Sequence, residues 1–268
     1  MSVKFVYSIC LFFLVANTSY LSAQSSTKTQ GLKKLSQSSE LWYSNGYEIR
    51  ASAIQDFLSE AIAFYKFEFP ETAEGIEIMI LDKNDWTQRY SEIPYGIPFF
   101  DAEKSIVIPA DKFTASSELG YEDLSTDQEI SEYDKFIISI LGQSYILKSR
   151  GLDISEIWMR DVISNYFAVS FFEVNDFLWD LSFGQSKVIS PGSLEVYNRL
   201  HKELPADRFY GYQIKFIELS ATLFNKGGFQ MLTELLDHFQ QKGSVDQAET
   251  IISKYGGEEY DIWKASMK

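Results

Sequence analysis

Two long apolar segments near the middle of the chain constrain its fold most strongly. Residues 133–149 and 155–172 carry apolar side chains at helical spacing, and a short loop that includes residues 150–153 joins them. Apolar residues that recur every three or four positions lie on one face of a helix. The pattern therefore predicts two core helices joined by a short loop.

The chain before these segments has a different pattern. Residues 51–67 repeat apolar side chains at helical spacing, whereas 76–81 and 105–110 are short, β-branched stretches bounded by turn residues and proline. Residues 93–100 hold two prolines and a glycine, which is typical of an irregular edge strand. Strands followed by helices predict an α+β protein, with a small N-terminal sheet and a helix followed by a mainly helical part.

Three further helices are expected towards the C-terminus. One covers residues 205–225 and a second covers 229–241, with Gly227 and Gly228 breaking the pattern between them. The third begins at Ser244, because serine is a preferred N-terminal cap.

The N-terminus has the features of a secretory signal peptide. A basic start at Lys4 precedes an apolar stretch over residues 5–16, and small residues follow up to Ala23. The apolar stretch is shorter than the roughly 20 residues that a spanning helix needs. We expect cleavage after Ala23 and no stable membrane span in the mature protein. An uncleaved anchor is the alternative.

The mature chain divides into a leader and one domain. Residues 24–39 are polar and aperiodic, and are expected to form a flexible leader. Residues 40–268 are expected to form a single domain, in which 40–115 hold the helix and sheet and 132–268 hold the helices. An acidic surface loop is expected between these parts, at residues 115–131.

The composition of the chain bears on its cellular compartment and on the classes of molecule that it can bind. The single cysteine, Cys10, lies inside the signal peptide, so the mature protein has no disulfide. Export without disulfides fits a bacterial envelope, in the periplasm or outside the cell. Removal of Lys4 with the signal changes the formal net charge from −14 to −15. Such a surface repels nucleic-acid phosphates, so DNA or RNA binding is excluded.

The two central helices also resemble the active-site helices of gluzincin metallopeptidases, the peptidase MA-like group of the thermolysin and aminopeptidase type. In that family the first helix reads H-E-L-G-H and the second reads W-x-x-E. Here Leu141 and Gly142 match the L-G pair, Trp158 matches the tryptophan, and Asp161 stands at the final acidic position. The resemblance covers roughly residues 45–265, including the sheet and the helical tail.

The resemblance implies a degenerate metal site. It places Ser139 and Gln143 at the two histidine positions, Ile140 at the glutamate position and Asp161 at the third ligand. Histidines four residues apart on a helix share one face and bind one zinc ion, and the glutamate is the general base. Tyr212 lies near the place where the family often has an oxyanion-stabilising tyrosine.

These replacements remove the family's chemistry. Serine and glutamine are poor zinc ligands, and isoleucine cannot act as a base. The two histidines, His201 and His238, lie outside both helices and are expected on polar helix faces. We therefore expect no catalytic zinc and no other cofactor. A hydrogen bond from Gln143 to Asp161 is expected to fill the place of the metal.

Three kinds of function follow. The first is a pseudoenzyme, a secreted and non-catalytic peptidase-like protein whose cleft binds a peptide or an envelope partner. The second is a hydrolase with metal-free chemistry, for example between two carboxylates, which need not be adjacent in sequence. The third is a purely structural envelope protein. Convergence of Ser139, Gln143 and Asp161 on an open cleft would favour binding, whereas their burial in a filled core would favour the structural role.

Overall fold

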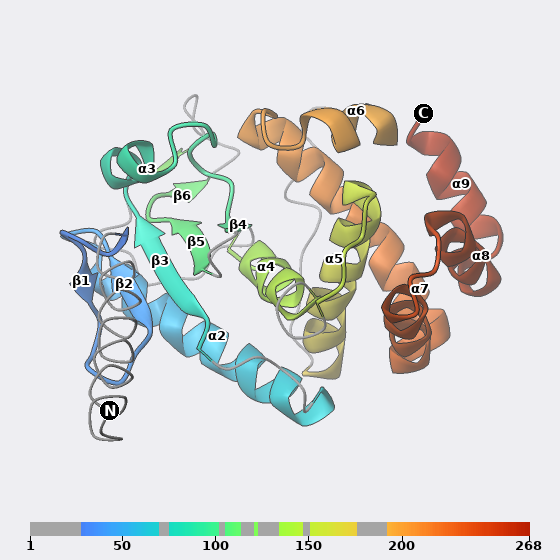
Figure 1. Ribbon diagram of the computed structural model, residues 1–268, viewed down its shortest axis with the longest axis horizontal. Helices are drawn as coiled ribbons and strands as arrows, with labels where there is room; N and C mark the ends of the chain where they lie inside the picture. The colour runs from blue at the N-terminus through green and yellow to red at the C-terminus, as the bar shows by residue number, and fades with distance from the viewer. Residues whose placement is uncertain are drawn as a thin grey trace, which may run out of the picture.

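The computed structural model describes residues 28–69, 75–101, 105–113, 121–122, 134–146, 151–175 and 192–268. Within these residues it contains a five-stranded mixed sheet and eight helices, which confirms the predicted α+β class. Figure 1 shows the sheet at one end of the molecule and most of the helices at the other. The predicted signal peptide lies outside the described residues, as does most of the predicted acidic loop.

The sheet has three parallel strands flanked by two antiparallel edges. Its order is β1-β2-β3-β5-β4, and β2, β3 and β5 are parallel. β1 and β4 pair antiparallel at opposite edges. The strands are β1 (Lys33–Lys34), β2 (Leu41–Tyr43), β3 (Glu77–Leu81), β4 (Phe99–Phe100) and β5 (Ser105–Pro109). A separate antiparallel pair joins β6 (Lys112–Phe113) to β7 (Tyr121–Glu122).

Two expectations about this part are wrong in detail. The flexible leader does not extend over residues 28–39, because β1 pairs with β2 and Leu32 is buried against Met79 and Trp86. The predicted edge strand at 93–100 shortens to β4. The partner strand β2 lies beyond the predicted leader, so the polar composition of the leader alone does not reveal this pairing.

Both faces of the sheet are covered. Ile78 and Ile80 of β3 join the main core, whereas Met79 and Leu81 point to the other face, as alternate strand residues do. That second face is closed by Trp86 from α3 (Lys83–Arg89). The sequence predicts only a turn here, but Asp82 caps a short helix by accepting a 2.7 Å hydrogen bond from the backbone of Asp85.

The helices form a layer that continues the main core away from the sheet. α4 packs against β4 and β5 on one side and against α5 on the other, and α5 packs on α7 (Figure 1). The helices that surround the main core are α2 (Glu48–Glu68), α4 (Phe136–Ser144), α5 (Ile157–Val174) and α7 (Ala206–Gln240). The remaining helices are α6 (Leu194–Leu200), α8 (Val245–Gly256) and α9 (Glu258–Ser266). The predicted pair of central helices is confirmed.

The predicted helix break and helix cap are also confirmed. Gly228 interrupts α7 with φ 49° and ψ −152°, a conformation that glycine adopts without a side-chain clash. The Tyr166 hydroxyl donates a 2.8 Å hydrogen bond to its carbonyl. Ser244 begins α8 in a capping box with Gln247.

A buried ion pair ties the start of α2 to the start of α4. Arg50 is 1% exposed and donates from Nη1 to Asp134 Oδ2 at 2.9 Å, while Nη2 contacts Oδ1. A two-point contact between guanidinium and carboxylate fixes the geometry as well as the charge. The helical layer is thereby anchored to the helix that underlies the sheet.

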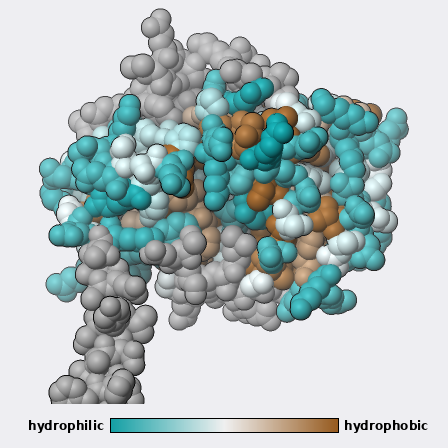
Figure 2. Space-filling view, turned by 45° about the horizontal axis from the view of Figure 1, so that its top comes forward, coloured by the Kyte–Doolittle hydropathy of each residue, from teal (hydrophilic) through white to brown (hydrophobic). Residues whose placement is uncertain are grey.

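Among the described helices, none combines the length and the hydrophobicity needed to cross a lipid bilayer. On the face shown in Figure 2, hydrophobic residues gather near the middle, among hydrophilic ones.

The two central helices approach each other closely at Gly142. A Cβ atom at this position would lie 2.7 Å from Cβ of Phe167 and 3.0 Å from the carbonyl oxygen of Ser164 on α5. Both neighbours belong to the core of the packed helix pair, so neither is a flexible chain end. The approach therefore needs a residue without a side chain.

We predict that Gly142→Ala destabilises the protein by about 1–3 kcal/mol, because the added methyl overpacks the α4–α5 contact. In an open helix the same change would stabilise by about 1 kcal/mol. Ser52→Ala, at an exposed position of α2, is the control and should change stability by less than about 0.5 kcal/mol. Urea unfolding measures the free energy of unfolding of the wild type and of the two variants. A Gly142→Ala variant more stable than the wild type would contradict the close packing.

Candidate functional site

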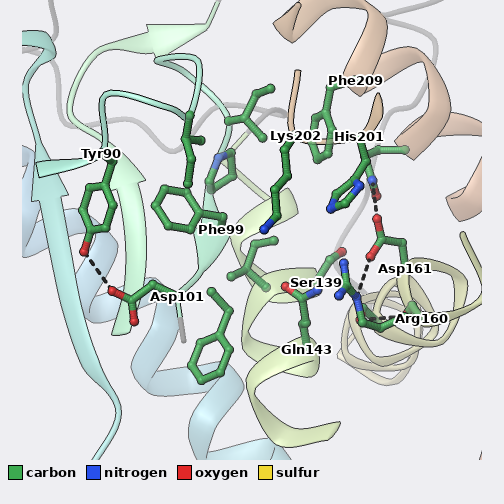
Figure 3. A pocket seen from close by; sticks show the side chains of 17 residues that line it. Tyr90, Phe99, Asp101, Ser139, Gln143, Arg160, Asp161, His201, Lys202 and Phe209 are labelled. Carbon is green, nitrogen blue, oxygen red and sulfur yellow. Dashed lines mark hydrogen bonds and ion pairs between the residues drawn. The ribbon is translucent and has the colours of Figure 1, made fainter. Parts of the chain in front are cut away.

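A cavity of about 500 Å³ lies between the edge of the sheet and the helical layer. One wall comes from residues 90–101, including β4, and the floor comes from α4 and α5. The opposite wall comes from the end of α6 and the first turns of α7. Figure 3 shows the side chains of these walls directed towards a common space.

The structure brings four of the five expected site residues to this cavity. Ser139, Ile140 and Gln143 line it from α4, and Asp161 lines it from α5. Residues spaced three and four apart share a face of a helix, which explains why the α4 residues converge. Tyr212 does not line the cavity. It is buried, and its hydroxyl donates to the carbonyl of Ser193 at 3.2 Å.

A chain of hydrogen bonds links the first of these positions to α7. Ser139 Oγ donates to Asn165 Oδ1 at 2.5 Å, and Asn165 Nδ2 donates to Gln213 Oε1 at 2.8 Å. All three residues are buried. Buried polar groups destabilise a fold unless they form hydrogen bonds, and each of these three side chains is hydrogen-bonded to another. Ser139 therefore serves as a donor in a structural network.

The same series of hydrogen bonds continues to Asp161. Gln213 Nε2 donates to the Tyr197 hydroxyl at 2.8 Å and to Asp161 Oδ2 at 3.2 Å. The Tyr197 hydroxyl donates in turn to Asp161 Oδ2. Burial raises the pKa of Tyr197 well above its ordinary value, and the charge of Asp161 raises it further. The phenol therefore stays protonated and acts as a donor.

The expected hydrogen bond between Gln143 and Asp161 is wrong, because Arg160 stands between them (Figure 3). With its amide oxygen turned towards Arg160, Gln143 accepts from Nε at 2.7 Å and from Nη2 at 3.1 Å. Arg160 Nε also lies 3.4 Å from Asp161 Oδ1. A guanidinium thus occupies the region that the resemblance assigns to a metal ion.

The residues at these positions do not fit a zinc ion. Ser139 is already bonded to Asn165, and Gln143 is bonded to the cation of Arg160. That positive charge would repel a divalent metal, and neither an alcohol nor an amide is a normal zinc ligand. In the described ranges, no group of three or more His, Cys, Asp or Glu side chains is placed to hold a metal ion.

His201 is not on a polar outer face, as its sequence context suggests. It caps the end of α6 and lines the cavity, and its Nδ1 is buried with no hydrogen-bond partner among the described residues. Burial lowers the pKa of His201, the negative charge of Asp161 opposes this, and the cations Arg160 and Lys202 add to the lowering. The ring is therefore neutral at pH 7. His238 lies elsewhere, with Nε2 2.8 Å from the carbonyl oxygen of Ser244.

The cavity holds a second carboxylate on the opposite wall. Asp101 accepts from Lys28 Nζ at 2.6 Å, from the Tyr90 hydroxyl at 2.9 Å and from the backbone of Ser105 at 3.0 Å. Both oxygens of Asp101 are used by these donors, as both oxygens of Asp161 are used by others. Each carboxylate acts as a hydrogen-bond acceptor for the protein, which does not favour a role as proton donor to a ligand.

Several residues of the site were not expected from the sequence. Tyr197, His201 and Lys202 come from α6 and its end, and this helix was not predicted. Its one local signal is Ser193, whose side chain accepts from the backbone of Val196 as an N-terminal cap. Gln213 was also not expected, although it faces the cavity and the neighbouring Tyr212 does not.

We predict that Tyr197→Phe lowers the free energy of unfolding by about 1–3 kcal/mol, because Asp161 and Gln213 both lose a buried partner. Tyr65→Phe is a matched control, since the Tyr65 hydroxyl is buried with no partner among the described residues. Its removal should be neutral or stabilising. Chemical denaturation compares the two variants, and an equal effect of both would contradict the network.

A scan against protein-family models, a search of curated proteins and a search of solved structures each found no match to this chain. Inference about function therefore depends on the cavity and on the side chains that line it.

Proposed function

We propose that this chain is an exported, non-catalytic protein of the gluzincin type that binds a peptide, or an extended segment of an envelope partner, in its cavity. One observation carries the proposal. Ser139, Gln143 and Asp161, which stand at the ligand positions of the resemblance, converge on an open cavity and not on a filled core. A purely structural role would give no reason to keep this space.

The polar network supports the non-catalytic part of the proposal. Asp161 is held by Tyr197, Gln213 and Arg160, and Ser139 is held by Asn165. Ile140 stands where a general base would be needed, and an aliphatic side chain cannot accept a proton. At the positions where the family carries the groups for metal-dependent hydrolysis, this chain has side chains that hydrogen-bond to neighbouring protein groups or are aliphatic.

The edge of the sheet supports the peptide-binding part. In an antiparallel pair, residues alternate between hydrogen-bonded and non-bonded positions. Asp101 N donates to the Ser105 carbonyl at 2.9 Å, so Phe100, one position earlier, directs its N–H and C=O away from β5. Within the described residues β4 is the last strand on this side. An added peptide strand would pair there.

The remaining walls suit apolar side chains. They include Ile93, Ile97, Pro98, Phe99 and Phe209. A cavity of about 500 Å³ lies within the usual range of ligand pockets, which combine apolar walls with a few polar groups. An extended peptide along β4 would therefore have a place for one or two of its side chains beside its backbone contacts.

We predict that N-terminally fluorescent, randomised hexapeptides bind the wild-type protein and that Ile140→Trp weakens this binding at least about tenfold. The indole would fill space at the floor of the cavity. Ile262→Trp is the control, because Ile262 is 62% exposed on α9 and does not line the cavity. Fluorescence anisotropy measures the peptide affinities of the wild type and of both variants. Absence of any peptide binding, or equal binding by the two variants, would count against the proposal.

We also predict that zinc binding can be installed. A variant with Ser139→His, Ile140→Glu, Gln143→His and Asp161→Glu should bind zinc weakly, and adding Arg160→Ala should increase its affinity by removing the competing cation. The matched control lacks only Gln143→His. Competition with a chelating dye measures the affinities. Failure of every variant to bind zinc while folded would contradict the gluzincin-like geometry.

A further inference from the structure

We infer that the cavity recognises the free C-terminal carboxylate of a bound peptide, with Lys202 and Arg160 as its cationic partners. This inference rests on the proposed peptide-binding function and names the part of the peptide that reaches the former metal position. The carboxylate would lie between the end of α6 and the floor formed by α4 and α5.

Among the described residues, the charges around the cavity leave Lys202 without an ion pair. Asp101 is paired with Lys28, and Asp161 is paired with Arg160. Lys202 has no ion pair among the described residues, and its side chain lines the cavity. The chain as a whole carries a formal net charge of −14, so an unpaired cation that faces a cavity is a local exception. An anionic group would complete the pairing.

The two cations point to the same space. In Figure 3 the Lys202 ammonium extends into the cavity beside His201, and the Arg160 guanidinium lies below it near Ser139. Arg160 uses Nε and Nη2 on Gln143 and Asp161, so Nη1 has no partner within the described part of the chain. Its side chain is 18% exposed, which leaves it accessible to a ligand. Guanidinium and ammonium donors together match the two oxygens of a carboxylate.

The surroundings favour a peptide end over a larger anion. The open edge at Phe100 would pair with the preceding residues of a peptide, and the apolar side chains of Phe99 and Phe209 would contact its last side chain. The acidic molecular surface repels polyanions, whereas a neutral or basic peptide carries its single negative charge at the terminus. The cavity therefore fits a peptide with an apolar last residue.

The test uses two N-terminally fluorescent hexapeptide pools, randomised at the first five positions and ending in leucine, one as the free acid and the other as the amide. The wild type should bind the acid pool at least about tenfold more tightly than the amide pool, since charge-assisted hydrogen bonds are stronger than neutral ones. Lys202→Gln should remove most of this difference, and an unchanged preference for the acid pool would overturn the role of Lys202.

Lys83→Gln is the matched control. Lys83 is exposed at the start of α3, and its substitution changes the net charge by the same amount as Lys202→Gln. It should bind both pools as the wild type does. Both lysines are exposed, so unfolding midpoints in urea should confirm that the two variants remain folded.

The outcomes separate this inference from the proposed function. Equal binding of both pools, weakened by Ile140→Trp, would keep the peptide-binding function and overturn the carboxylate inference. If neither pool bound the protein, the peptide-binding function would be overturned. If N-acetyl-leucine then bound in a Lys202-dependent manner, the cavity would recognise small carboxylic acids, and the peptide terminus would be ruled out as the source of the carboxylate.

Discussion

The arrangement of the cavity depends on one guanidinium. Arg160 lies between Gln143 and Asp161 and contacts both, so the position that would need a metal ion already holds a positive charge. A cation fixed by the protein needs no metal ligands around it, and it repels a metal that would otherwise enter. On the gluzincin resemblance, the acidic position on α5 therefore needs no histidines at the two α4 positions. Asp161 remains useful as the partner of Arg160.

The rest of the network follows from burial. Asp161 also accepts from Tyr197 and Gln213, and Gln213 accepts from Asn165, which is bonded to Ser139. In a low-dielectric interior a polar network is stable only when its members are all satisfied. The close approach of α4 and α5 at Gly142 holds the two ends of this network in register. Packing and polar pairing thus stabilise the same helix pair and leave the cavity beside it open.

Much of the fold could be predicted from the sequence because its signals are local. The apolar periodicity of α4 and α5, the β-branched strands β3 and β5 and the cap at Ser244 are all contained in short windows. The sequence did not predict β1, whose partner strand β2 lies beyond the polar leader, or α6, which is a single short helix of 7 residues. The missing α6 also hid Tyr197, His201 and Lys202.

The site could be predicted only in part, for a similar reason. Helical spacing places Ser139, Ile140 and Gln143 on one face, but spacing does not show which way a long side chain turns. Arg160 precedes Asp161 in the sequence, and its neighbours give no local signal for the contact that its side chain makes. Its guanidinium reaches across to Gln143 on another helix, a contact that only the packed structure defines.

Under the proposed gluzincin-like arrangement, the Arg160 guanidinium fills the position that a catalytic metal would hold. The most direct test of this claim is the zinc content of the wild-type protein after equilibration with zinc, measured beside peptide cleavage in the same sample. We expect zinc far below one ion per chain and no cleavage that a chelator abolishes. One tightly bound zinc ion per chain, lost on Asp161→Ala together with chelator-sensitive cleavage, would contradict the claim.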